Sequence, residues 1–152
     1  MLDELASLGR EVRLYGLGRT GSEGPLTFRP AMREGFLEDL ASCRAVLSTA
    51  GNQLMGEAMA YAKPVLVVPE STVEQRLNAR EIVRMGIGES LAPAELRRET
   101  IMAFLARSEA YAARARELES DGQAQAVEWL ERWVHELSKS NADTRLGAVQ
   151  PV

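Results

Sequence analysis

Residues 45–79 most constrain how this chain can fold, because two short apolar runs there flank one helical pattern. The first run is Ala45–Ser48 and the second is Val65–Val68. An apolar stripe at helical spacing lies between them, formed by Leu54, Met55, Ala58 and Met59. Such runs favour parallel strands that are buried on both faces. The segment therefore predicts an α/β fold, in which ligands bind beyond the carboxyl ends of the strands.

Similar but weaker patterns continue on both sides of this segment. Short strands are expected at 11–15, 26–29 and 86–89, and helices at 1–8, 34–42, 74–85, 93–104, 110–119 and from 122 to about 139. We therefore expect a parallel sheet of about four to five strands flanked by helices. This domain should cover residues 1–139, and residues 140–152, which lack periodicity, should form a disordered tail.

Composition excludes several classes of function. A chain of 152 residues is long enough for one domain with a core, and its net charge of −4 argues against nucleic acid as a partner. No apolar run approaches the roughly 18 residues that cross a bilayer. The first ten residues lack the features of a signal peptide, and the single Cys43 cannot form an internal disulfide. We therefore expect a cytoplasmic protein.

The loop after the first apolar run has the chemistry of an anion site. It reads Thr49-Ala50-Gly51-Asn52, with Gly51 directly before the helix. The start of a helix offers unpaired N–H groups, and a glycine lets an anion approach the backbone. Glu57 lies about one turn inside the helix and shares a face with Gln53. These residues suit a ribose diphosphate, with the carboxylate of Glu57 on the ribose hydroxyls.

Together these motifs resemble a known family. The resemblance rests on Ala50-Gly51, Glu57, Lys63-Pro64, the strand Val65–Pro69 and Gln75-Arg76-Leu77-Asn78-Ala79, and is strongest over residues 28–88. The segment resembles the carboxyl-terminal, donor-binding half of a GT-B glycosyltransferase, in the family 28 branch that includes the lipid II N-acetylglucosaminyltransferase. The chain departs from this family at Ala62, where glycine is common, and at Asn52, where many members have a second glycine.

The resemblance implies a Rossmann-like domain that holds a nucleotide-diphosphate sugar, expected to be a UDP-sugar, as donor substrate without a cofactor or a metal. The residues expected to contact the diphosphate are Thr49, Ala50, Gly51, Asn52 and Gln53. Glu57 is assigned to the ribose, Glu74 and Gln75 to the transferred sugar, and Phe28, Arg29 and Pro30 to the base. For two of these an alternative stays open, in which Phe28 belongs to the core and Arg29 is solvated.

The resemblance also implies that part of the catalytic unit is absent. In GT-B enzymes the acceptor site and the usual general base belong to an amino-terminal domain, so no catalytic residue is expected in this chain. The family domain begins with a central strand and a glycine loop, which residues 1–8 would normally follow. We therefore expect an inactive fragment of an inverting hexosyltransferase whose partner is that domain, through which it could associate peripherally with a membrane.

Other interpretations of the sequence are weaker. A nucleotide-sugar epimerase would share the fold but need a histidine near the donor, and the only histidine, His135, is expected on the surface of the last helix. A non-catalytic binding subunit would use the apolar stripe of that helix for docking. Gly16, Gly18 and Gly21 satisfy G-x-G-x-x-G, but Ser22, Gly24 and Pro25 prevent a following helix, so a flexible loop is expected.

Overall fold

The computed structural model describes residues 1–30, 33–118 and 122–146. The chain divides into two compact units, Met1–Leu118 and Glu119–Val152. The first unit contains, in order, α1 (Leu2–Ala6), β1 (Val12–Tyr15), β2 (Gly21–Glu23), β3 (Leu26–Arg29), α2 (Arg33–Ser42), β4 (Val46–Ser48), α3 (Asn52–Ala60), β5 (Val65–Val67), α4 (Val73–Met85), β6 (Gly88–Ser90), the short 3-10 helix η1 (Pro93–Glu95) and α5 (Arg98–Glu117). Of the second unit, the structure describes helix α6 (Gly122–Leu146).

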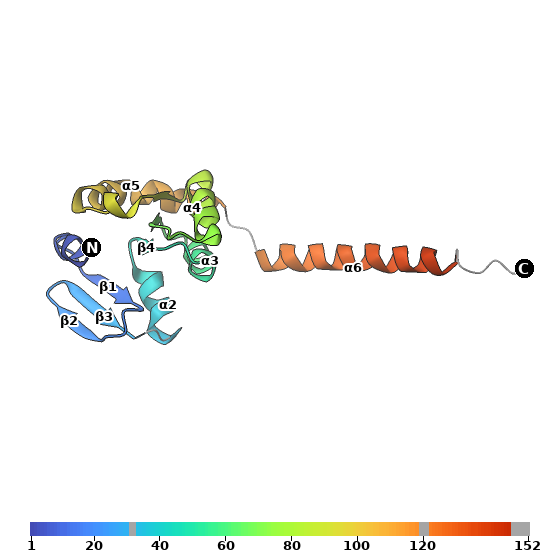
Figure 1. Ribbon diagram of the computed structural model, residues 1–152, viewed down its shortest axis with the longest axis horizontal. Coiled ribbons are helices and arrows are strands. Elements are labelled where there is room, and N and C mark those ends of the chain that lie inside the picture. The colour runs from blue at the N-terminus through green and yellow to red at the C-terminus, as the bar shows by residue number, and fades with distance from the viewer. Residues whose placement is uncertain (31–32, 119–121, 147–152) are drawn as a thin grey trace, which may run out of the picture. The chain divides into compact units, whose positions relative to one another are not determined.

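The strands form two three-stranded sheets, which Figure 1 shows with helices α3, α4 and α5 gathered around the second one. The second sheet has the order β4-β5-β6 and is entirely parallel, with Val46 opposite Val65 and Val65 opposite Gly88. The predicted α/β fold class with a parallel sheet flanked by helices is confirmed. The strands are divided between two sheets, however, in which β1 and β4 are each paired on one side only.

Strand β5 is buried on both faces, as its apolar run predicts. Val65 and Val67 pack into one hydrophobic cluster with residues of α3 and α4, including Met55 and Ile82. Leu66 points to the opposite face and joins a second cluster. This alternation follows from the two-residue period of a strand. Each buried aliphatic side chain contributes about 1.5–3 kcal/mol, so this short strand is a major source of stability.

The second cluster connects the two sheets. Leu66 of β5 shares it with Leu26 and Phe28 of β3. Residues of α1 and α5 complete it, among them Leu5 and Phe104. The two sheets therefore pack into one core although their strands are not hydrogen-bonded to each other.

The first sheet corrects one prediction. Strand β3 pairs in parallel with β1 and antiparallel with β2. The stretch that contains Gly16, Gly18 and Gly21 was expected to be a flexible loop, but β2 begins at Gly21 and forms a hairpin with β3. Since no helix follows the glycines, the dinucleotide fingerprint is excluded.

Helix boundaries differ from prediction in the last third of the chain. The two helices expected at 93–104 and 110–119 are the 3-10 helix η1 followed by one continuous helix, α5. The last helix, expected to end near 139, continues to Leu146, so part of the predicted tail is helical. The rest of that tail, 147–152, lies outside the described residues. No helix in the described ranges is long and apolar enough to span a bilayer.

We expect Gly88→Ala to destabilise the fold strongly. A Cβ atom at Gly88 would lie 1.9 Å from the carbonyl oxygen of Val65, so the backbones of β5 and β6 would have to separate. The free energy of unfolding should fall by about 3 kcal/mol or more in a chemical denaturation experiment. The matched control is Gly56→Ala, which meets no atom within 4 Å and lies inside α3, and should raise stability by about 1 kcal/mol.

Ala62→Gly should stabilise the protein. Ala62 follows the end of α3 with a φ of 50°, in the left-handed region where residues with a Cβ are strained. Replacement should raise the free energy of unfolding by about 0.5–1 kcal/mol, measured by denaturation. Ala106→Gly, at an exposed position inside α5, should instead lower it by about 1 kcal/mol. If Ala62→Gly lowered the stability as Ala106→Gly does, the conclusion that Ala62 is strained would be wrong.

Candidate functional site

The structure brings together the loops that follow β4 and β5. Because these strands are parallel neighbours, both loops open at the same edge of the sheet. Two hydrogen bonds join helix α4, which follows the second loop, to the first loop and the start of α3. The amide nitrogen of Asn52 donates to Oε1 of Glu74 at 3.3 Å, and Nδ2 of Asn78 donates to the carbonyl oxygen of Ala50 at 2.9 Å. The predicted diphosphate residues and Glu74 are thus adjacent, although 22 residues separate Asn52 from Glu74.

The start of α3 has the geometry of an anion site. Gly51 is the N-cap residue, with φ −64° and ψ 138°, and no side-chain cap hydrogen bond is formed there. A Cβ atom at Gly51 would meet nothing within 4 Å, so the space above this backbone is open. Thr49, Asn52 and Gln53 are exposed. The positive end of the helix therefore faces solvent through small or polar residues.

Ala50 shapes this loop rather than lining its surface. It is completely buried and has a φ of 68°, in the left-handed region. Its amide nitrogen donates to Oγ of Ser48 at 3.1 Å, and its carbonyl oxygen accepts the bond from Asn78. Asn78 therefore has a structural role, because its side chain holds the strained Ala50 in place.

Glu57 lies in the middle of α3 and is half-buried. Its Oε1 accepts a hydrogen bond of 3.1 Å from Nε2 of Gln53, one turn earlier in the helix. This contact confirms that the two side chains share a face. The carboxylate is thus held on the same side of α3 as the predicted diphosphate residue Gln53, with part of its surface open.

Gln75 serves the loop before α4. Its Oε1 accepts from the amide nitrogen of Glu70 at 2.8 Å, while Thr72 caps the helix by accepting from the amide nitrogen of Gln75 at 3.3 Å. Gln75 therefore fixes the conformation of residues 70–75 at the edge of the site.

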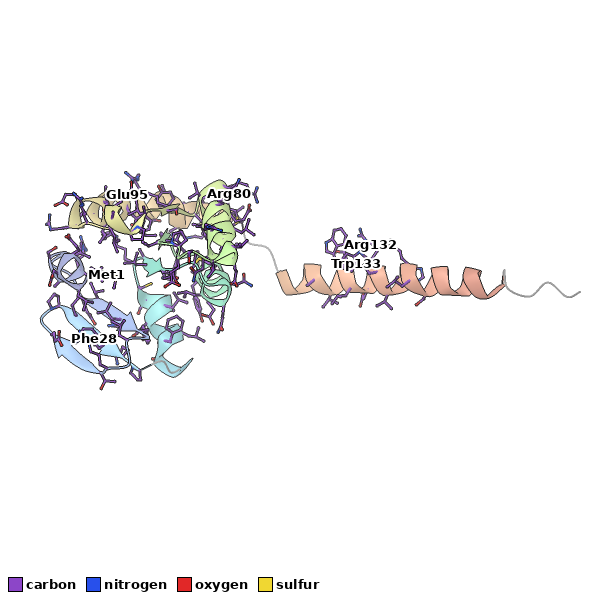
Figure 2. All side chains as sticks on the ribbon, in the orientation of Figure 1. Met1, Phe28, Arg80, Glu95, Arg132 and Trp133 are labelled. Carbon is purple, nitrogen blue, oxygen red and sulfur yellow. The ribbon has the colours of Figure 1, made fainter. Side chains whose placement is uncertain are left out.

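The three residues predicted at the base lie in different environments. Phe28, labelled in Figure 2, belongs to the core, as the alternative interpretation predicted. The guanidinium carbon of Arg19 lies 3.6 Å from the centroid of its ring. Its ring therefore has no free face for a base. Arg29 and Pro30 are exposed at the carboxyl end of β3, and Nε of Arg29 lies 3.7 Å from Oδ2 of Asp39.

Asp39, which sequence analysis did not identify, organises that strand end. The carboxylate of Asp39 accepts hydrogen bonds from the side chains of Tyr15 and Arg13 in β1. It also lies near the guanidinium of Arg29 in β3. Burial raises the pKa of Asp39, but the bonds from Tyr15 and Arg13 outweigh it, so the pKa lies below its usual value. Burial, followed by the bond to Asp39, raises the pKa of Tyr15 to about 12. No local motif marks these contacts, because the partners are 24 and 26 residues apart.

The remaining candidates supply no chemistry at this edge. No group of three His, Cys, Asp or Glu residues within the described ranges could hold a metal ion.

Cys43 is half-buried, and burial raises the pKa of its thiol. Its Sγ donates a hydrogen bond to the carbonyl oxygen of Leu40. His135 is exposed on α6, as predicted.

Two grooves elsewhere on the first unit do not contain Gly51, Asn52 or Glu57. One, of about 550 Å³, lies between α4 and β6 and is lined by Pro69, Arg76, Ala79, Arg80, Val83, Arg84 and Ser90. The other, of about 360 Å³, is lined by residues that include Cys43 and Lys63, before β4 and β5.

We expect Asp39→Asn to remove an acid-sensitive part of the stability. A carboxyl whose pKa is lower in the folded state stabilises the fold above its unfolded pKa of about 3.9 and loses this contribution as the pH falls through the folded pKa. At pH 7 the variant should lose about 1.5–3 kcal/mol in denaturation experiments, and its difference from wild type should shrink toward pH 2. Glu38→Gln, on the exposed side of α2, should change little at either pH.

Comparison with known proteins shows the family of this chain. Residues 1–108 match the family model described as Glycosyl transferase family 1. A search of curated proteins finds no match. Among solved structures, the glycotransferase of kitacinnamycin is similar with a TM-score of 0.68 and 19% identity over 86% of this chain. The spinosyn forosaminyltransferase has a TM-score of 0.67 and 20% sequence identity over 87% of this chain. A glycosyltransferase from Streptomyces nogalater has a TM-score of 0.61 and 23% sequence identity over 76% of this chain.

These similarities show the fold of half a GT-B glycosyltransferase. The aligned region spans 38%, 37% and 32% of the lengths of those three chains. At these identities the match concerns the fold alone, so the residues of the site are argued from the geometry described above.

Proposed function

Because this chain belongs to glycosyl transferase family 1, we propose that it is the donor-binding half of an inverting glycosyltransferase that uses a nucleotide-diphosphate sugar. The observation that carries this proposal is the start of α3 beside Glu57, where Gly51 gives no side-chain cap and leaves the space above its backbone open. The donor is inferred to be a UDP-sugar from the sequence motifs of residues 28–88.

The first-turn amides of α3 are proposed to bind the diphosphate. A helix start combines free N–H donors with a partial positive charge, and Gly51 leaves room for phosphate oxygens to reach them. The exposed hydroxyl and amide groups of Thr49, Asn52 and Gln53 can add hydrogen bonds to the same anion. Ala50 contributes its conformation, which sets the direction of the loop.

Glu57 is proposed to hold the ribose. A carboxylate accepts hydrogen bonds from two neighbouring hydroxyls, and the bond from Gln53 already orients it. One turn of helix separates it from the proposed phosphate site, which fits the distance between a ribose and its diphosphate. For the base, the exposed strand end at Arg29 and Pro30 is proposed, with Asp39 holding Arg29 in position.

In the proposed reaction, an acceptor hydroxyl attacks the anomeric carbon while the diphosphate departs. Negative charge grows on the leaving group, and the positive end of α3 stabilises it without moving. This electrostatic contribution is the part of catalysis that we assign to the chain. The general base and the acceptor site are proposed to belong to an amino-terminal domain that faces this one.

A titration with UDP followed by NMR tests the proposal. UDP should shift the amide signals of Gly51, Asn52 and Glu57, and UMP, which lacks the second phosphate, should bind at least tenfold more weakly because it loses a phosphate contact worth about 1.5 kcal/mol or more. Glu57→Gln should weaken UDP binding about five- to tenfold, since one charge-assisted hydrogen bond is lost.

The control for this titration is Glu81→Gln, which removes a carboxylate on the exposed side of α4, where Glu81 pairs with Arg84. It should leave the affinity for UDP within twofold. Unchanged spectra of the wild-type protein at millimolar UDP would refute the proposed donor site.

A further inference from the structure

Glu74 occupies the place that the proposed function gives to a diphosphate. Its Oε1 accepts the hydrogen bond from the amide nitrogen of Asn52, the first residue of α3. Glu74 itself lies in the first turn of α4 and is exposed, and among the described residues it takes part in no salt bridge. A carboxylate is favourable at the positive end of a helix for the same reason that a phosphate is.

We propose that Glu74 closes the diphosphate site in the ligand-free protein, and that a donor binds by displacing this carboxylate from the amide of Asn52. The inference rests on the proposed function and adds a competing group within the same site. Two anions cannot share one amide, because their charges repel at contact distance with an energy of the order of thermal energy or above even in water. The carboxylate therefore lowers the affinity for any ligand whose only anion is the diphosphate.

Displacement of Glu74 leaves the loop intact. The carbonyl oxygen of Ala50 is held by Asn78, and the loop before α4 is held by Gln75 and Thr72. None of these contacts involves the Glu74 side chain, which is exposed and free to rotate. The site can thus exchange its internal carboxylate for an external phosphate without a change in the backbone.

The displaced carboxylate gives the site a preference for nucleotide sugars. Once it leaves Asn52, it remains within one side-chain length of the diphosphate and can accept hydrogen bonds from sugar hydroxyls next to it. With a nucleotide sugar, these hydrogen bonds to the sugar replace the lost bond to Asn52. A free nucleotide diphosphate has no sugar at this place and offers no such replacement. Glu74 is therefore a positioning residue that disfavours the product diphosphate relative to the donor.

The test compares wild type, Glu74→Gln and Glu81→Gln, each checked for native folding by NMR. Glutamine keeps the shape and an acceptor oxygen but removes the charge. Glu74→Gln should bind UDP about five- to tenfold more tightly than wild type at low salt, and the gain should shrink at high salt. Glu81→Gln, with the same change of charge on the same helix, should stay within twofold of wild type.

A second readout needs no nucleotide. In the ligand-free protein, the amide signal of Asn52 should shift in Glu74→Gln and stay in place in Glu81→Gln. If wild type binds UDP and Glu74→Gln binds it equally or more weakly, the inference is wrong and the proposed function stands. If no variant binds UDP at millimolar concentration, the proposed function fails and the inference fails with it.

Discussion

The burial of β5 on both faces is the constraint from which the rest of the fold follows. Val65 and Val67 pack against α3 and α4, and Leu66 packs against the cluster that joins the two sheets. Gly88 lies so close to Val65 that the spacing of β5 and β6 permits no side chain there. Because this strand cannot shift, the loops at the carboxyl ends of β4 and β5 keep a fixed separation, and the site can be built across them.

The elements around β5 could be predicted from the sequence because their signals are local. The apolar runs and the stripe at helical spacing predicted β4, α3 and β5 to within one residue of most ends. The pairing of Gln53 with Glu57 follows from helix geometry in the same way. The approach of Glu74 to the start of α3 follows from the parallel pairing of β4 with β5, which places both following helices at one edge of the sheet.

Features that depend on distant residues could not be predicted. Asp39 collects Tyr15, Arg13 and Arg29 from two strands, and nothing near it in the sequence signals that role. The hairpin of β2 with β3 has weak strand propensity and two glycines, so it resembled a loop. The left-handed conformation of Ala50 could not be predicted from the residue type, because alanine rarely adopts this conformation. It is held by the hydrogen bond from Asn78, a distant residue in the sequence.

Two side chains of α4 contact the loop before α3 and the start of that helix, and they have different roles. One holds the shape of the loop, and the other places a negative charge at the helix start. Asn78 is neutral, so its bond to Ala50 can remain when an anion binds nearby, and the strained loop keeps its shape. Glu74 is charged, so its bond to Asn52 competes directly with any anion. The amide of Asn78 therefore holds the shape of the loop, and the carboxylate of Glu74 balances the positive charge at the start of α3. At the proposed diphosphate site, the neutral Asn78 would thus preserve the shape of the loop, while the charged Glu74 would limit the affinity for an anion.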